Sequence, residues 1–184
     1  AQDVPMEPLQ RRRTVRNGYA NRLLTESELS HVTARSSAFH YFARGTAGAR
    51  YLSEGTIQAN QVQAYREPAQ VELADWIRWS AADQAKYRNG LTPAGMEIEG
   101  VAGWYVSHFY DRDSALTRSF REKGLAQVRE RVAEGAGWLV LEGAPGISGL
   151  IETGREFQRM WLRLRARGLA IHPMTQLLEE TPDV

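Results

Sequence analysis

The sequence contains no cysteine, which excludes disulfides, thiolate metal sites and cysteine nucleophiles. It also has no run of about 18 apolar residues, so it predicts no transmembrane helix. Neither sign of charge dominates, because 23 basic residues stand against 22 acidic ones and the formal net charge is +1. A protein that binds a polyanion over a broad surface usually carries a larger excess, so any anion site here should be local.

Common catalytic signatures are missing as well. The chain has no HExxH, GxSxG, Walker or GxGxxG motif. Its four histidines, His31, His40, His108 and His172, show no metal-ligand spacing. We therefore predict no metal site.

Length and composition are those of an ordinary globular domain. The 184 residues are 42% hydrophobic and 24% charged, which predicts one domain over residues 1–184 and argues against disorder. The chain begins with Ala1, so we expect either that something was removed or that this is part of a longer chain. We predict a cytoplasmic location and leave export to the periplasm open.

Hydrophobic periodicity and turn residues predict a loose alternation of helices and strands, without a regular βαβ rhythm. Thr25 with Glu28 three residues later is a capping box that begins the first helix. The alternation favours an α+β domain with few strands. The first half of the chain is predicted to hold an extended lead-in at 1–9, a strand at 39–45, helices at 49–67 and from Pro68 to 80, and a long irregular stretch at 80–103. The second half is predicted to hold a helix at 114–134 with Gly124 as its weak point, a buried central strand at 137–143, an amphipathic helix at 148–168, a strand or extended edge at 169–173 and a short helix at 174–184. The helix at 148–168 places five residues on one face: Leu150, Gly154, Phe157, Trp161 and Leu164.

The stretch QRRRTVRNGY at 10–19 is the clearest candidate for an anion site. Guanidinium groups grip phosphate or carboxylate oxygens in bidentate fashion, and Thr14 adds a hydroxyl within the same stretch. The cations are Arg11, Arg12, Arg13 and Arg16. A solvated charge run has the same composition, so from this motif alone both interpretations stay open.

Two further stretches could line a ligand. LEGAPG at 141–146 has the glycines of a backbone cradle, but a strand-to-helix turn needs the same residues, and we favour the turn. Pro173 ends any strand after His172 and turns the chain into a loop, a position that either lines a pocket or only terminates the strand.

Several of these segments resemble the FMN-dependent nitroreductase family. RRTVR at 12–16 resembles its Arg-Arg-Ser-x-Arg signature, and GLAIHPMTQ at 168–176 resembles the loop that follows its long Gly-Arg helix. ELADWIRWS at 72–80 is similar to the two-domain, Acg-like branch. The resemblance spans roughly residues 8–180, and the loop at 168–176 is its more specific part.

The resemblance implies a fold, a cofactor and a set of site residues. It implies a nitroreductase-like α+β fold, with an antiparallel-rich sheet flanked by helices and the flavin at an interface between two such units. Its phosphate and ribityl contacts are Arg12, Arg13, Thr14 and Arg16. Its contacts beside the flavin ring are His172, Pro173, Met174, Thr175 and Gln176, with no catalytic residue assigned. Backbone donors in that loop would stabilise negative charge on the ring.

Two departures from the family pattern affect the expected assembly. The chain has no Asn-x-Gln-Pro-Trp segment and no closing arginine-rich tail. In the two-domain branch the former belongs to the preceding half, so we expect this chain to be most of a C-terminal half. A complete flavin site would then need a homodimer or a missing N-terminal half.

The sequence therefore supports three hypotheses about function. The first is an FMN-dependent oxidoreductase that passes hydride from NADH or NADPH to nitroaromatic or quinone-like acceptors. The second is a protein that binds or sequesters flavin without turnover, with residues 80–103 as a possible lid or a plain long loop. The third, a nucleic-acid contact by the arginines, is disfavoured by the balanced charge and by the lack of interleaved aromatic residues. We also expect no membrane partner.

Overall fold

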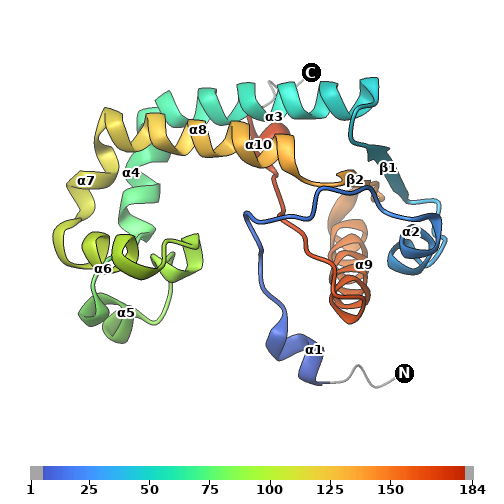
Figure 1. The fold of residues 1–184 in the computed structure, drawn as a ribbon, viewed down its shortest axis with the longest axis horizontal. Helices are drawn as coiled ribbons and strands as arrows, with labels where there is room; N and C mark the ends of the chain where they lie inside the picture. The colour runs from blue at the N-terminus through green and yellow to red at the C-terminus, as the bar shows by residue number, and fades with distance from the viewer. Residues whose placement is uncertain (1–5, 181–184) are drawn as a thin grey trace. The chain divides into compact units, whose positions relative to one another are not determined.

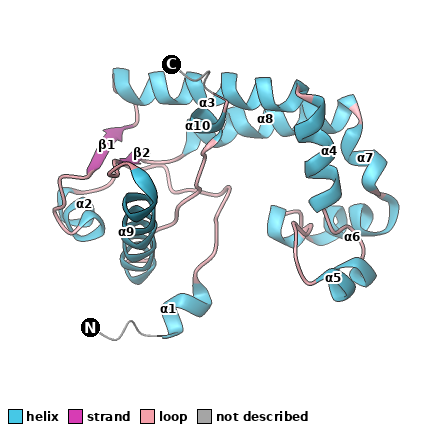
Figure 2. Cartoon of the chain, turned by 180° about the vertical axis from the view of Figure 1, so that it is seen from behind, coloured by secondary structure: helices cyan, strands magenta, loops and turns pink. Residues whose placement is uncertain are grey.

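The computed structural model describes residues 6–180 of a helix-rich α+β chain (Figures 1 and 2). The chain divides into two compact units. The first comprises Ala1–Ser53 with Ala133–Pro173, and the second comprises Glu54–Val132 with Met174–Val184. The prediction of one domain over residues 1–184 stays a prediction, because two compact units of one chain can still fold together.

The first unit is built on a two-stranded antiparallel sheet. β1 (Phe39–Ala43) pairs with β2 (Gly137–Leu141), so that Phe39 lies opposite Leu141 and Ala43 lies opposite Gly137. α2 (Glu26–Thr33) and α9 (Gly146–Ala166) pack beside this pair (Figures 1 and 2). Their shared core comprises Val32, Phe39, Met160 and Leu164.

The prediction of a strand at 137–143 is confirmed, but the prediction that this strand is buried and central is wrong. The strand forms at Gly137–Leu141, but both strands of a two-stranded sheet are edges. Val140 is 38% exposed, and the other apolar residues of β2 are half-buried. A continuous apolar run cannot by itself distinguish a strand covered on both faces from one covered on a single face.

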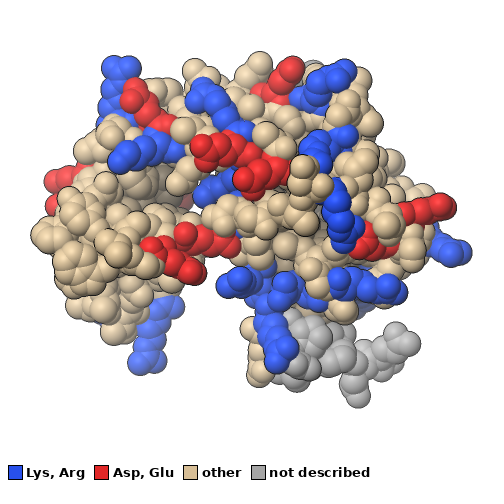
Figure 3. Space-filling view, in the orientation of Figure 1, with Lys and Arg blue, Asp and Glu red and all other residues tan. Residues whose placement is uncertain are grey.

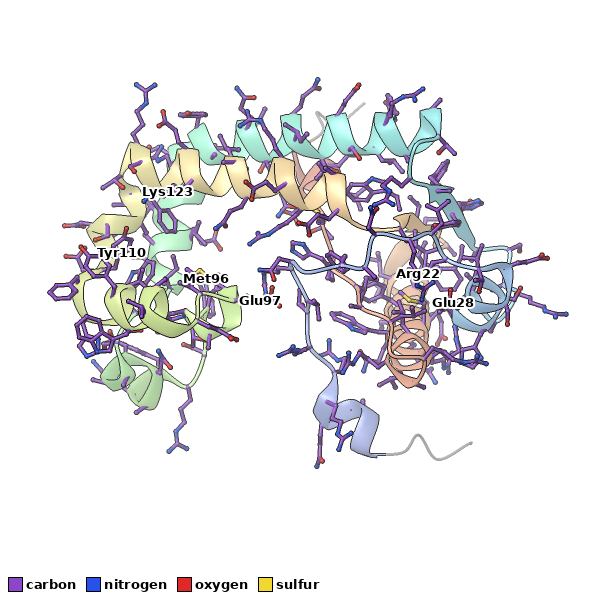
Figure 4. The ribbon with its side chains drawn as sticks, in the orientation of Figure 1. Arg22, Glu28, Met96, Glu97, Tyr110 and Lys123 are labelled. Atoms are coloured by element: carbon purple, nitrogen blue, oxygen red, sulfur yellow. The ribbon has the colours of Figure 1, made fainter. Side chains whose placement is uncertain are left out.

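The capping box of α2 is confirmed. Thr25 accepts a hydrogen bond from the Glu28 amide through its hydroxyl, and the Glu28 carboxylate accepts one from the Thr25 amide at 2.8 Å. Arg22 completes the arrangement by pairing with Glu28 at 2.6 Å, and the two labelled side chains face each other in Figure 4. Local sequence alone encodes this helix start, which is why it could be predicted.

α9 differs from its prediction along part of its length. It runs from Gly146 to Ala166, and its second half is buried around Met160, Trp161 and Leu164. Leu150, expected on the buried face, is 70% exposed, and Gly154 is also exposed. Periodicity gives the direction of a helix face but not how far along the helix a neighbour covers it.

The N-terminal segment forms a helix where extended chain was predicted. α1 (Met6–Arg11) is helical, so the prediction of extended chain at 1–9 fails over residues 6–9, and residues 1–5 lie outside the described part. Proline is tolerated in the first turn of a helix, and Pro8 is the third residue of α1.

The second unit contains most of the short helices. They are α4 (Glu67–Trp76), α5 (Ala81–Tyr87), the 3₁₀ turn η1 (Ala94–Met96), α6 (Gly100–Phe109) and α7 (Arg112–Leu116). Their core surrounds Trp79, whose ring meets Tyr110 edge-to-face at 5.3 Å and Phe120 at 6.0 Å. Met96 packs against the same cluster, and Figure 4 labels it together with Tyr110.

The prediction of a long irregular stretch at 80–103 is wrong. Ser80 caps α5 through its hydroxyl, which accepts from the Asp83 amide at 3.1 Å. The chain then turns at Gly90 (φ +83°), where a Cβ would come within 2.3 Å of the Trp76 carbonyl oxygen. This close approach lets Leu91 bridge to Ile77 before η1 and α6 follow. The polar and glycine-rich composition of this stretch predicted a loop, but tertiary packing stabilises helices there.

The expected helix at 114–134 is divided in two. α7 ends before Thr117, and α8 (Arg118–Glu134) begins after it because the Thr117 hydroxyl accepts from the Phe120 amide at 3.3 Å. Gly124, the expected weak point, is exposed within α8 and disturbs nothing. A threonine that can cap a helix therefore interrupts this segment where the glycine does not.

The remaining predicted elements form with shifted ends. The helix expected at 49–67 is α3 (Ala47–Tyr65), which runs from the first unit into the second, as α8 runs from the second into the first. Residues 169–173 form no strand and have no regular secondary structure. α10 (Gln176–Glu179) is the described part of the helix expected at 174–184, whose last four residues lie outside the described range.

Candidate functional site

The arginine segment follows α1 in the first unit. Arg11 lies in the last turn of α1, and residues 12–16 continue without regular secondary structure. The Arg12 guanidinium lies over the indole ring of Trp161, 4.4 Å from its centroid. Figure 3 shows basic side chains gathered over α1 and the chain that follows it. This stacking orients one cation of the segment against α9.

A backbone hydrogen bond joins the arginine segment to the stretch that precedes His172. The Val15 amide donates to the Ile171 carbonyl at 3.2 Å, and the Tyr19 hydroxyl donates to the Val15 carbonyl. Ile171 also packs against the core of the first unit. The arginine segment and the 169–173 stretch, from opposite ends of the sequence, therefore lie side by side.

α9 contributes two polar groups that the sequence analysis missed. The indole Nε1 of Trp161 and the Nε of Arg165 are buried, and within the described part of the chain neither finds a hydrogen-bond partner. Trp161 is only 5% exposed, and Arg165 follows it at the i,i+4 spacing that places both on one helix face. Leaving a buried donor unpaired costs about 1–3 kcal/mol, so both groups favour a bound acceptor.

The remaining predicted contacts in this unit differ in exposure. Arg13 is exposed, whereas Thr14 and Arg16 are half-buried. The ion pairs formed among the described residues do not include Arg12 or Arg13. His172 and Pro173 are half-buried at the end of the unit. The structure thus places the predicted phosphate residues and the first two residues of the predicted ring loop in the same unit.

The other three predicted loop residues belong to the second unit. Met174 and Thr175 lead into α10, and the Thr175 hydroxyl donates to Glu179 at 2.5 Å. Gln176 begins α10, and its buried Oε1 has no hydrogen-bond partner among the described residues.

α10 is anchored on the second-unit part of α3. Arg66 donates to Glu180 at 2.5 Å, and Gln63 donates to the same carboxylate at 3.3 Å. The Arg66 hydrogen bond is the main reason that the pKa of Glu180 lies below its usual value. Leu177 fills the space that a side chain at Gly55 would occupy. These contacts fix where the chain leaves the predicted loop.

Two open surface depressions carry carboxylates instead of cations. One, of about 560 Å³, lies on α4 beside Glu67, Glu72 and Asp75. The other, of about 360 Å³, lies where LEGAPG enters α9, and Glu142 and Glu152 line it. Neither suits a phosphate, because like charges repel. No cluster of three potential metal ligands occurs in the described range.

The comparisons with known proteins add no relative. No family model, no curated protein and no solved structure matches the chain. Among the described helices, none combines the length and the apolar character that a membrane crossing requires.

Proposed function

We propose that this chain binds FMN through its arginine segment and acts as an FMN-dependent oxidoreductase of the nitroreductase type. The observation that carries the proposal is the hydrogen bond from Val15 to Ile171. It joins the two segments that the family resemblance links to the flavin, although they lie at opposite ends of the sequence.

The chemistry of the available donors fits a phosphate group. Arg12 and Arg13 form no ion pair within the described chain, and Trp161 and Arg165 each hold a buried N–H without an acceptor. A phosphate offers several anionic oxygens, and charge-assisted hydrogen bonds to them are about twice as strong as neutral ones. A local cluster of cations also agrees with a net charge of only +1.

The flavin ring side of the proposal follows the family resemblance. It assigns His172, Pro173, Met174, Thr175 and Gln176 to the ring edge, where amide donors would stabilise negative charge. Bound FMN would supply the hydride chemistry between NADH or NADPH and a nitroaromatic or quinone-like acceptor. The chain's own residues would hold the phosphate, orient the ring and neutralise charge.

One observation favours the alternative, a protein that binds flavin without turnover. Within residues 10–19 and 169–173, His172 is the one residue whose ordinary pKa lies near neutrality, and neither stretch contains Asp or Glu. No acid–base pair is available there, so turnover would depend on protons from water. Residues 80–103, the possible lid of this alternative, form α5, η1 and the start of α6.

Titration with FMN and with riboflavin tests the binding proposal. The two ligands differ only in the phosphate, so a site built on these arginines binds FMN at least about a hundredfold more tightly, given 1.5–3 kcal/mol per charge-assisted contact. Equal affinities would contradict the phosphate assignment. Oxidation of NADH or NADPH by the FMN-loaded protein with a quinone acceptor then separates the oxidoreductase from the non-catalytic alternative.

A further inference from the structure

Trp161 carries a buried polar group without a partner in the described part of the chain. Its side chain is 5% exposed, and its Nε1 finds no hydrogen-bond acceptor there. A buried indole N–H normally has a partner. Trp138, in the same unit, shows the usual arrangement, because its Nε1 donates to the Ser53 hydroxyl at 2.9 Å. Trp161 therefore lacks an acceptor of the kind that Trp138 has.

A second unpartnered donor lies one turn further along α9. The Nε of Arg165 is buried without a hydrogen bond, and its guanidinium enters none of the ion pairs of the described residues. The spacing of i, i+4 places Trp161 and Arg165 on one face of the helix. The two carboxylates of α9, Glu152 and Glu156, are already paired with three other arginines of the helix: Arg155, Arg159 and Arg163. Neither carboxylate is therefore left over for Arg165.

A cation lies on the ring of Trp161. The Arg12 guanidinium is 4.4 Å from the ring centroid, and α1, whose end it follows, packs beside α9. The guanidinium can only donate, so it cannot satisfy the indole N–H. Because Nε1 belongs to the ring on which Arg12 lies, an oxygen that accepts from Nε1 is also close to the Arg12 N–H groups. The two residues together suit a ligand with several anionic oxygens.

An unpartnered indole is not by itself a ligand site. Trp79, in the second unit, is 4% exposed, and its Nε1 also has no partner among the described residues. Its ring, however, contacts Tyr110 and Phe120, and none of the described cations lies over it. The indole of Trp161 differs in combining the buried N–H with a guanidinium that forms no ion pair in the described chain.

We propose that Trp161 is a positioning and binding residue of the phosphate site. Its ring face holds the Arg12 guanidinium against α9, and its Nε1 donates a hydrogen bond to an oxygen of the bound phosphate monoester. Arg165 is the second donor from the same helix. This inference rests on the proposed function and extends it, because the family resemblance assigns the phosphate to residues 12–16 and assigns no residue of α9 to it.

Titration calorimetry of the full chain with FMN and with riboflavin tests the inference through Trp161→Phe. Phenylalanine keeps an aromatic face under Arg12 and removes the N–H donor. We expect FMN affinity to fall at least about tenfold, as the loss of a hydrogen bond to a charged group does, and riboflavin affinity to stay nearly constant. Arg165→Met, which removes the second donor at similar length, should also lower the preference for FMN and provides the test if Trp161→Phe does not fold.

Trp138→Phe is the matched control, because it removes an indole N–H that already has its acceptor in Ser53. This control should leave the ratio of FMN to riboflavin affinity unchanged. A wild-type ratio in both Trp161→Phe and Arg165→Met would overturn the inference and leave the phosphate proposal standing. An equal loss of both ligands in Trp161→Phe would also overturn it, by showing a purely structural role. A wild-type chain that binds FMN no more tightly than riboflavin would contradict the proposed function itself, and this inference with it.

Discussion

Removing two arginines of the 12–16 segment should weaken FMN binding and leave riboflavin binding nearly unchanged. The perturbation is Arg12→Ala with Arg16→Ala. Riboflavin lacks the phosphate, so the difference between the two ligands isolates the contribution of the phosphate contacts from any general damage to the site.

The expected magnitude follows from the type of contact. A hydrogen bond to a charged group contributes about 1.5–3 kcal/mol, so two guanidinium contacts contribute about 3–6 kcal/mol. Arg12 also stacks on Trp161 at 4.4 Å, an interaction worth about 0.5–1 kcal/mol at an exposed site. FMN affinity should therefore fall at least about a hundredfold, since each 1.4 kcal/mol is a factor of about ten in affinity.

Isothermal titration calorimetry with both ligands measures the affinities, and urea unfolding checks the stability. Arg155→Ala is the matched control, since Arg155 is an exposed α9 arginine whose partner is Glu152 at 2.9 Å. FMN affinity should be unchanged in this control. An FMN affinity that survives the double substitution, or a loss shared equally by riboflavin, would refute the phosphate assignment.

Three further predictions concern stability. Met160 is 1% exposed in the core of the first unit, so Met160→Ala should cost about 2–5 kcal/mol in urea unfolding. Gly137→Ala should lower the melting temperature, because φ is +150° and the new Cβ would come within 2.3 Å of the Phe42 carbonyl oxygen; an unchanged temperature would contradict that geometry. The hydrogen bond from Arg22 lowers the pKa of Glu28 from 4.5 to about 2. The ionised Glu28 carboxylate therefore stabilises the fold above pH 4.5, and this contribution is lost as the pH falls towards 2. Glu28→Gln should remove this part of the pH dependence of the unfolding free energy.

The elements that could be predicted from sequence are those encoded by neighbouring residues. The capping box at Thr25 and Glu28 marked the start of α2, and glycine-bounded β2 formed where its apolar run lies. Prediction failed where a distant contact decides the outcome. The first turn of α6, residues 100–103, lies in the stretch whose glycines predicted a loop. The number of strands depends on pairing partners that no local pattern reveals.

In the candidate site, too, the features set by local residues could be predicted and those set by distant contacts could not. Arg12 and its neighbours were recognisable as anion ligands from their chemistry alone. Trp161 was assigned to a helix face, but the sequence does not show that the Nε1 of Trp161 and the Nε of Arg165 are buried without a hydrogen-bond partner among the described residues. The family resemblance assigned residues at both ends of the chain to the flavin, but it did not predict the hydrogen bond between Val15 and Ile171. No periodicity relates two such distant segments.

The most direct test of FMN binding is the visible absorption spectrum of the purified full chain, with the cofactor released by heat and identified by mass. The proposal predicts a flavin spectrum and a released mass equal to that of FMN, either as purified or after incubation with FMN. A colourless protein that takes up no FMN at any concentration tested, as monomer or as dimer, would contradict it.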